Sequence, residues 1–187
     1  MEIVKTENDF YTNIEHAMSS IDKRFKQYPG YVICGSHDPQ DVDRKIATIK
    51  YAREKNIPVL GVCMGLQLML IEYARNVLNL KDANSTEIDP LTPHPIVTKL
   101  PELRVGIHQV ESNWESHWHN YAFNNKYKDL FGKDWALVYE GEILEGARLR
   151  GRRYHFGVQF HPEYREKHPL LESFIKSCKA NVVSQKV

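Results

Sequence analysis

The fold-determining stretch of this chain reads Ile57-Pro58-Val59-Leu60-Gly61-Val62-Cys63-Met64-Gly65-Leu66-Gln67-Leu68-Met69-Leu70-Ile71. Residues 58–62 are apolar or small and β-prone, and a proline bounds them, so they predict a short buried strand. After Cys63 the apolar residues fall at steps of three and four from Leu66 to Val77, which is helical spacing. The chain is therefore expected to pass from strand to helix at Cys63.

Two glycines flank the cysteine at this junction, Gly61 and Gly65, each two positions away. This is the layout of a nucleophile elbow, in which glycines remove Cβ atoms that would clash in a tight, strained turn. A thiol at the start of a helix meets unsatisfied N–H groups and the positive end of the helix dipole, and both favour thiolate. A lone cysteine is often only a small buried hydrophobe, so the elbow alone leaves both interpretations open.

A second stretch, Gly157-Val158-Gln159-Phe160-His161-Pro162-Glu163, is an apolar strand that ends in His-Pro-Glu. A parallel strand would deliver His161 to the crevice at the carboxyl ends of the sheet. Pro162 fixes the backbone, and the Glu163 carboxylate can orient the imidazole while the other ring nitrogen takes the thiol proton. The two stretches together predict a cysteine nucleophile with a histidine base.

These motifs resemble those of the class I glutamine amidotransferases, Gly-x-Cys-x-Gly-x-Gln and His-Pro-Glu. Residues 50–97, 121–125 and 157–174 look most like the glutaminase domain of CTP synthase. The resemblance implies an α/β fold, a flavodoxin-like three-layer sandwich with a mostly parallel sheet and some antiparallel strands in the second half. Residues 1–187 are expected to form a single class I glutamine amidotransferase-like domain, because a chain of 187 residues can bury one sizeable core.

Composition excludes several classes of protein. The chain is 42% hydrophobic and 26% charged with a formal net charge of +1, so neither a nucleic-acid nor a membrane surface is indicated. Its three cysteines are an odd number without pairing rhythm, which suits a reducing compartment. No signal-peptide run or 18-residue apolar segment occurs, so a cytoplasmic protein is expected.

The residue pattern predicts strands alternating with helices in the first half, which favours a parallel sheet covered on both faces. The expected strands are residues 2–5, 31–34, 58–62, 104–110, 136–139, 143–149 and 154–160. The expected helices are residues 10–25 with Asn8 or Asp9 as a cap, 41–52, 66–77, 126–131 and a closing helix containing 170–175. Residues 80–100 predict an ordered loop long enough to act as a lid. Compared with the family, a first strand and helix are expected to be missing, which would leave the sheet one strand short.

The resemblance also implies roles for individual residues. Cys63 would attack a γ-carboxamide carbon, His161 would move the proton and Glu163 would orient His161. The backbone N–H groups of Met64 and Gly35 would form the oxyanion hole. The residues implied to bind substrate are Gly65, Leu66, Gln67, Glu87 and Asn120, with Glu87 holding the α-ammonium.

Two departures from the family bear on the substrate. The loop Cys34-Gly35-Ser36-His37-Asp38-Pro39 replaces a Gly-Gly-Phe-Gly loop, and Asn120 replaces an arginine that contacts glutamine. The substrate is therefore expected to be glutamine or a larger γ-glutamyl amide. Because no phosphate-binding Gly-rich loop occurs, the chain either passes ammonia to a synthetase or amidoligase partner or acts as a free-standing hydrolase.

Two other functions remain open from the residues. His108 and the run His117-Trp118-His119 have spacing that could hold a metal, although no cysteine or aspartate cluster completes such a site. A paralogue that only binds its ligand is conceivable if the altered loop after Cys34 breaks the oxyanion hole. The main hypothesis expects neither a metal nor a cofactor.

Overall fold

The structure is a computed structural model that describes residues 1–6, 11–36 and 39–184. The strands are β1 (Glu2–Val4), β2 (Tyr31–Ile33), β3 (Val59–Val62), β4 (Asn84–Ser85), β5 (Pro95–Val110), β6 (Asn113–Phe123), β7 (Trp135–Glu140), β8 (Ile143–Leu149) and β9 (His155–Val158). The α-helices are α1 (Tyr11–Ile21), α2 (Val42–Glu54), α3 (Met64–Asn76), α4 (Lys128–Gly132) and α5 (Pro169–Ser184). Three short 3₁₀ helices are η1 (Phe25–Gln27), η2 (Asn125–Tyr127) and η3 (Pro162–Tyr164).

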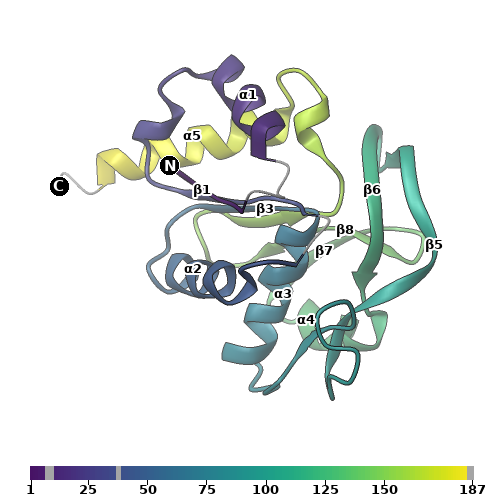
Figure 1. The fold of residues 1–187 in the computed structure, drawn as a ribbon. Helices are drawn as coiled ribbons and strands as arrows, with labels where there is room; N and C mark the ends of the chain where they lie inside the picture. Colours follow the sequence, from purple (N-terminus) through teal and green to yellow (C-terminus); the bar gives the residue numbers. More distant parts are fainter. Residues whose placement is uncertain (7–10, 37–38, 185–187) are drawn as a thin grey trace.

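The larger sheet has the order β1-β2-β3-β9-β8-β7. Its first four strands are parallel, whereas β8 and β7 are antiparallel to their neighbours. Helices α1 and α5 cover one face and α2 and α3 cover the other (Figure 1). The predicted three-layer α/β sandwich, with antiparallel strands in its second half, is confirmed.

Helix α3 lies at the centre of this architecture. Every residue from Met64 to Ala74 is buried, because the helix is covered by the sheet, by α2 and by the second sheet. A buried ion pair joins α3 to α2, with Arg53 donating hydrogen bonds of 2.7, 2.9 and 3.2 Å to Glu72. The predicted apolar stripe ends before Val77, which is the exposed C-cap. The start of α3 is thus held rigidly at the end of β3.

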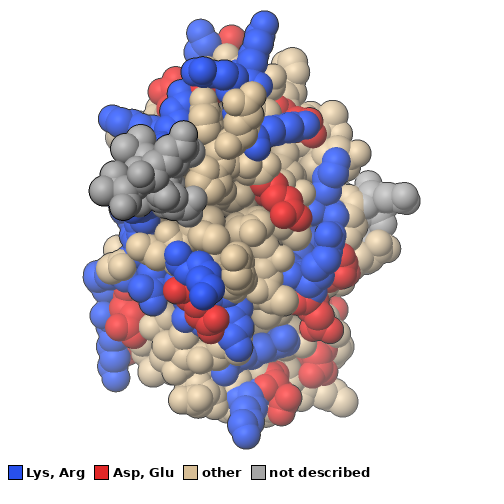
Figure 2. Space-filling model, turned by 90° about the vertical axis from the view of Figure 1, so that its left-hand side faces the viewer, with Lys and Arg blue, Asp and Glu red and all other residues tan. Residues whose placement is uncertain are grey.

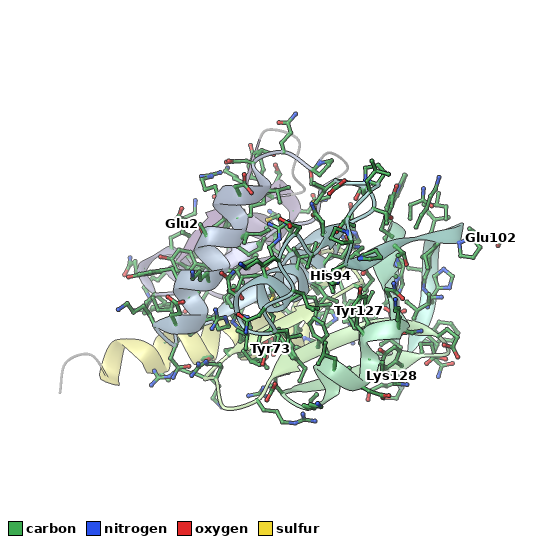
Figure 3. The ribbon with its side chains drawn as sticks, turned by 90° about the horizontal axis from the view of Figure 1, so that it is seen from below. Glu2, Tyr73, His94, Glu102, Tyr127 and Lys128 are labelled. Atoms are coloured by element: carbon green, nitrogen blue, oxygen red, sulfur yellow. The ribbon has the colours of Figure 1, made fainter. Side chains whose placement is uncertain are left out.

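A second sheet of order β4-β5-β6 lies beside the sandwich. Strands β5 and β6 form a long antiparallel ribbon, paired from Val97 with Phe123 to Val110 with Asn113. Viewed from below, Glu102 on β5 and Glu2 on β1 lie at opposite sides of the molecule (Figure 3). The ribbon therefore flanks the sandwich on the side away from the β1 edge.

The ordered loop expected over residues 80–100 is confirmed only in part, because β5 begins at Pro95. This segment contains β4 and the beginning of β5, and it buries Ala83, Ile96 and Val97 in the core. Strand β5 is longer than the expected 104–110, and β6 had no predicted counterpart. Prolines and polar residues made residues 95–100 look like part of the loop, but strand pairing with β4 and β6 begins there.

Several predicted elements are shorter than expected. The helix expected over 10–25 ends at Ile21, where Asp22 accepts a hydrogen bond from the backbone N–H of Arg24, and Phe25 enters the core from η1 instead. Asn8, Asp9 and Phe10 lie outside the described residues. Strand β9 ends at Val158, so His161 follows three residues beyond it.

The surface is mixed in charge. On the face shown in Figure 2, Lys and Arg side chains are interspersed with Asp and Glu, as expected for a net charge of +1. Within residues 1–6, 11–36 and 39–184, no helix has the length and apolar character needed to cross a bilayer.

Candidate active site

Cys63 occupies a strained turn between β3 and α3. Its backbone has φ 52° and ψ −109°, a region that non-glycine residues rarely adopt. A Cβ on Gly65 would lie 2.1 Å from the Ile33 carbonyl oxygen, and one on Gly61 would lie 2.6 Å from the Gly65 carbonyl carbon. The two glycines therefore permit a turn that holds the thiol at the edge of the sheet, as the elbow pattern predicts.

His161 and Glu163 form a buried pair beside this turn. His161 Nδ1 lies 2.8 Å from Glu163 Oε1, and the two residues are 2% and 8% exposed. Pro162 begins η3 between them and brings the carboxylate back toward the ring. The Glu163 bond uses Nδ1, so Nε2 is the nitrogen left to face a thiol.

Gly35 brings the cysteine and the histidine to the same point in space. A Cβ built on Gly35 would lie 3.2 Å from Cys63 Cβ and 3.2 Å from His161 Cε1. The residues at the ends of β2, β3 and the β9 extension thus converge, as expected at the carboxyl edge of a parallel sheet. A side chain at position 35 would press against both residues, so glycine fits there with the least strain.

The electrostatics of this site favour a charged imidazole. Burial by itself lowers the pKa of His161, but side-chain interactions with Cys63 and Glu163 outweigh burial and raise that pKa well above its usual range. An imidazolium flanked by a carboxylate and a sulfur is the arrangement that stabilises a thiolate. At Cys178, by contrast, burial outweighs the opposing charge of the N-terminal ammonium and raises the pKa of the thiol to about 12, which keeps that cysteine protonated.

Gln159 contacts the Cys63 sulfur and was not identified from the sequence. Its Nε2 donates to Cys63 Sγ at 3.6 Å, and its Oε1 accepts from Gln67 Nε2 at 3.3 Å. Gln67 Nε2 also donates to the Tyr121 carbonyl oxygen at 3.0 Å. Because Gln159 is two residues before His161, strand alternation would have placed both side chains on one face.

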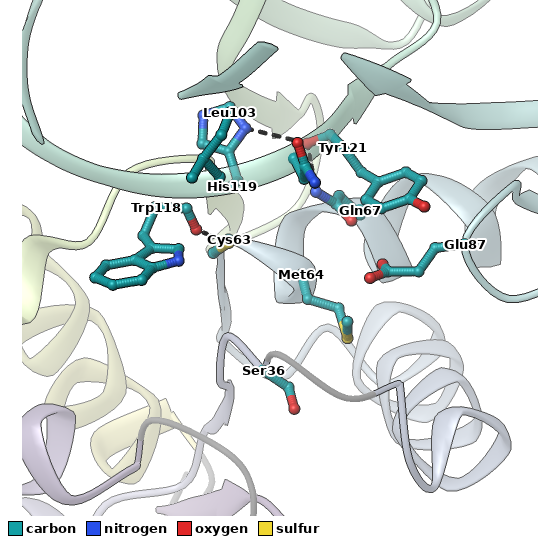
Figure 4. A pocket seen from close by; sticks show the side chains of 10 residues that line it. Ser36, Cys63, Met64, Gln67, Glu87, Leu103, Trp118, His119 and Tyr121 are labelled. Atoms are coloured by element: carbon teal, nitrogen blue, oxygen red, sulfur yellow. Dashed lines mark hydrogen bonds between the residues drawn. The ribbon is translucent and has the colours of Figure 1, made fainter. Parts of the chain in front are cut away.

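A cavity of about 200 Å³ opens beside Cys63 (Figure 4). Its lining residues are Ser36, Cys63, Met64, Gln67, Glu87, Leu103, Trp118, His119, Asn120 and Tyr121. The predicted residues Cys63, Met64, Gln67, Glu87 and Asn120 are therefore brought together around one space. Gly35, Gly65 and Leu66 do not line it.

Buried packing explains why two predicted substrate contacts lie outside the cavity. Gly65 packs against the Ile33 carbonyl, and Leu66 packs directly under Gly157, where an added Cβ would lie 2.8 Å from Leu66 Cδ1. Both residues hold the elbow against the sheet. Their side-chain positions serve packing and do not reach the cavity.

Strand β6, which was not predicted as a strand, forms a wall of the cavity and carries Asn120. The Ser116 carbonyl accepts from the His161 backbone N–H at 2.8 Å. The Trp118 carbonyl accepts from Cys63 Sγ at 3.8 Å. The backbone of the second sheet therefore contacts both the cysteine and the histidine of the first.

The alternative of a metal site depends on the arrangement of the histidines on this ribbon. His117 Nδ1 lies 3.4 Å from His119 Nε2, and the rings of His108 and His117 are 5.2 Å apart. The pKa of His117 is lowered to about 3 and that of His119 to about 4, and burial is the largest cause of both shifts. Both imidazoles are therefore neutral. Among the residues that the structure describes, no group of three or more His, Cys, Asp or Glu could hold a metal ion.

The sequence matches the protein-family profile described as "Glutamine amidotransferase class-I" over residues 4–176. The chain belongs to the class-I glutamine amidotransferase family. The resemblance to this family was based on the cysteine elbow and the His-Pro-Glu segment. In the structure these two segments lie next to each other.

Curated relatives of this class-I glutamine amidotransferase chain are CTP synthases. It is 35% identical over 191 residues to CTP synthase of Caldanaerobacter subterraneus subsp. tengcongensis, covering 84% of this chain and 35% of that protein. It is 36% identical over 189 residues to CTP synthase of Sulfurisphaera tokodaii, covering 87% of this chain and 35% of that protein. The chain thus spans about a third of the length of these relatives.

A solved structure shares the fold. The glutaminase domain of Trypanosoma brucei CTPS, solved with bound acivicin, superposes with a TM-score of 0.81 at 22% sequence identity. The match covers 95% of this chain and 92% of that domain. The class-I glutamine amidotransferase architecture therefore extends over nearly all of the chain.

Proposed function

We propose that residues 1–187 form one glutaminase domain that hydrolyses the γ-amide of glutamine through Cys63, His161 and Glu163. One observation carries the proposal: a cysteine in a strained elbow lies against a buried histidine whose far nitrogen is 2.8 Å from a buried carboxylate. A nucleophile, a base and a group that orients the base are the parts that acyl transfer from an amide requires.

The first half of the reaction makes a thioester. The Cys63 thiolate attacks the γ-carboxamide carbon, and the carbonyl oxygen becomes an oxyanion. The tetrahedral intermediate collapses with cleavage of the C–N bond, and the His161 imidazolium gives its proton to the departing nitrogen, which leaves as ammonia. Glu163 holds the ring so that Nε2 faces the reacting atoms.

The second half releases glutamate. His161, now neutral, takes a proton from water, and the hydroxide adds to the thioester carbonyl. Collapse of this intermediate breaks the C–S bond, so Cys63 leaves as thiolate beside the imidazolium. The enzyme is thereby returned to its starting charge state.

Backbone N–H groups of Met64 and Gly35 are the proposed oxyanion donors. Met64 is the first residue of α3, where N–H groups have no partner within the helix. Gly35 lies within contact distance of both Cys63 and His161. Donors fixed before the reaction stabilise the developing charge without reorganisation.

Glu87 and Gln67 are proposed to bind the amino-acid end of the substrate. Both line the cavity, and in Figure 4 they lie on the same side of Cys63. A carboxylate at Glu87 would attract the substrate α-ammonium, and a ligand without that charge would lose this interaction. This pairing would select glutamyl compounds.

The fate of the nitrogen distinguishes two versions of this function. In one version, ammonia would pass to a synthetase or amidoligase partner. Asn120 lines the cavity at a position where the family resemblance implies an arginine. This difference favours a second candidate function, a free-standing hydrolase of a γ-glutamyl amide.

Glutamate release tests the proposal. Purified protein is incubated with glutamine, alone and with candidate synthetases, and with Cys63→Ser as the control. Turnover that needs Cys63 supports the glutaminase, and dependence on a second protein supports the amidotransferase. A protein that releases no glutamate from any γ-glutamyl amide, and whose Cys63 is not alkylated by a glutamine-like electrophile, would be a binding paralogue.

A further inference from the structure

The outer face of the β5–β6 ribbon is apolar. Its exposed large apolar side chains are Leu103, Val105, Ile107, Trp114 and Trp118. On β6 the inward positions are instead polar, since Glu115, His117 and His119 are buried. A strand usually buries its apolar side chains and exposes its polar ones, and this ribbon does the reverse. Folding alone does not explain that arrangement, and a concentration of exposed apolar side chains on one face indicates a binding role.

Two members of this face belong to the cavity. Trp118 and Leu103 both line it, although they are 54% and 49% exposed. The Trp118 carbonyl lies 3.8 Å from Cys63 Sγ, so the indole is attached to the backbone that touches the nucleophile. Val105, also exposed, pairs with Trp118 across the ribbon. The apolar surface therefore begins at the reacting sulfur.

The positions of the cavity residues fix the direction of a bound substrate. In Figure 4 Cys63 lies between Trp118 on one side and Glu87 on the other. If the α-ammonium pairs with Glu87 and the γ-carbonyl lies at the sulfur, the amide nitrogen points away from Glu87, toward Trp118. Ammonia would leave this surface uncovered, whereas an amine with a hydrocarbon substituent would cover it.

We propose that Trp118 and Leu103 form a leaving-group subsite for γ-glutamyl amides whose nitrogen carries an apolar or aromatic substituent. This inference rests on the proposed function, and it names the substrate class for the free-standing version. The C–N bond breaks as before, His161 gives its proton to the nitrogen, and a primary amine leaves in place of ammonia. Water then hydrolyses the Cys63 thioester to glutamate.

The test compares amides that differ only in the size of the leaving amine. γ-Glutamyl-methylamide and γ-glutamyl-n-hexylamide release alkylamines of closely similar basicity, so their chemistry is matched. In the wild type, kcat/KM for the hexylamide is expected to exceed that for the methylamide about tenfold or more. Trp118→Ala keeps the backbone carbonyl and is expected to reduce this ratio to about one, while Trp118→Phe retains part of it.

Trp114→Ala is the matched control. Trp114 is exposed on the same ribbon but does not line the cavity, so its removal should leave the hexyl-to-methyl ratio unchanged. The proposal is overturned if the wild type shows no preference for the hexylamide, or if Trp118→Ala keeps the preference. A ribbon face that serves a protein partner would give the first of these results.

Binding without turnover separates this proposal from the proposed function. Dissociation constants of both amides are measured by calorimetry on Cys63→Ser and on Cys63→Ser combined with Trp118→Ala. A tenfold preference for the hexylamide that Trp118→Ala abolishes supports the subsite even if the wild type hydrolyses neither amide. Equal affinities for the two amides reject the subsite even if glutamine is hydrolysed.

Discussion

Two histidines on one segment of chain show how a buried imidazole becomes functional or remains structural. His155 begins β9 and His161 follows its end, and they are 1% and 2% exposed. His155 packs edge-on against Trp135, and within the described part of the chain neither of its ring nitrogens has a hydrogen-bond partner. His161 instead faces Glu163 at 2.8 Å.

Their pKa values move in opposite directions. Burial, with smaller effects from Arg53 and Arg152, lowers the pKa of His155 to about 3. His161 is buried to a similar degree, but Cys63 and Glu163 outweigh that burial and raise its pKa. Burial alone therefore makes a neutral packing residue, whereas burial with a carboxylate and a thiol makes a proton carrier.

Replacing the imidazole of His161 and that of His155 in turn should give the largest difference in activity. His161→Ala is expected to lower kcat/KM for glutamate release on the order of 10⁴-fold, because both proton transfers lose their carrier. His155→Phe should stay within about twofold of the wild type. Steady-state glutamate release measures both variants; retention of more than a tenth of the activity in His161→Ala would remove His161 from the mechanism.

Glu163→Gln tests the carboxylate that distinguishes the two histidines. Its loss should lower kcat/KM on the order of 10²- to 10³-fold, because the ring loses its orientation and the charge that raises the His161 pKa. The alkaline limb of the pH profile should also move to lower pH, since the imidazolium is then lost earlier. The exposed Glu166→Gln is the control, and an unshifted profile in Glu163→Gln contradicts the assignment.

The free energy of unfolding should depend on pH in a way that reflects the lowered pKa of His155. A group with a lowered pKa in the folded state contributes stability that is complete above its unfolded pKa and is lost as pH falls through the folded value. Between pH 6.5 and about pH 3 the wild type should lose about 1.4 kcal/mol per pH unit from this residue. The free energy of unfolding of His155→Phe in urea should therefore rise relative to that of the wild type by roughly 3 kcal/mol as the pH falls from 7.5 to 4.5.

Exposed His16 supplies the control for that measurement, as His16→Asn. If His155→Phe and the wild type lose stability in parallel as pH falls, then His155 titrates normally. In that case burial would not be what separates the two histidines.

Gln159 gives the smallest expected effect. Gln159→Met removes the donor that lies 3.6 Å from Cys63 Sγ while keeping the volume of the side chain. The donor is a neutral amide and the acceptor is a thiolate, so losing this hydrogen bond is expected to lower kcat/KM about tenfold. Gln109→Met, an exposed change on β5, should have no effect, and equal activities of the two variants would show that Gln159 only fills space.

The sequence was most informative where local physics decides the structure. The turn at Cys63 could be predicted because only glycine at positions 61 and 65 leaves room for it. The meeting of Cys63 with His161 followed from a parallel sheet, which collects its carboxyl ends at one edge. These features depend on neighbouring residues or on one rule of topology.

The ribbon could not be predicted because its pattern opposes the usual rule. Strand β6 buries Glu115, His117 and His119 and exposes Trp114 and Trp118, so alternation assigns its faces the wrong way round. The cavity wall formed by β6 depends on pairing with β5 and on contacts to His161 and Cys63. Such long-range contacts leave no local signal in the sequence.

The most direct measurement is the site of covalent labelling by a glutamine-like electrophile, such as a chloro-dihydroisoxazole amino acid. Intact mass and peptide mapping of the labelled protein should show one adduct, on Cys63, and Cys63→Ser should take none. Cys34 and Cys178 are buried cysteines outside any disulfide and serve as internal controls. An adduct on either of them, or labelling that persists in Cys63→Ser, would contradict the central claim that Cys63 is the activated nucleophile.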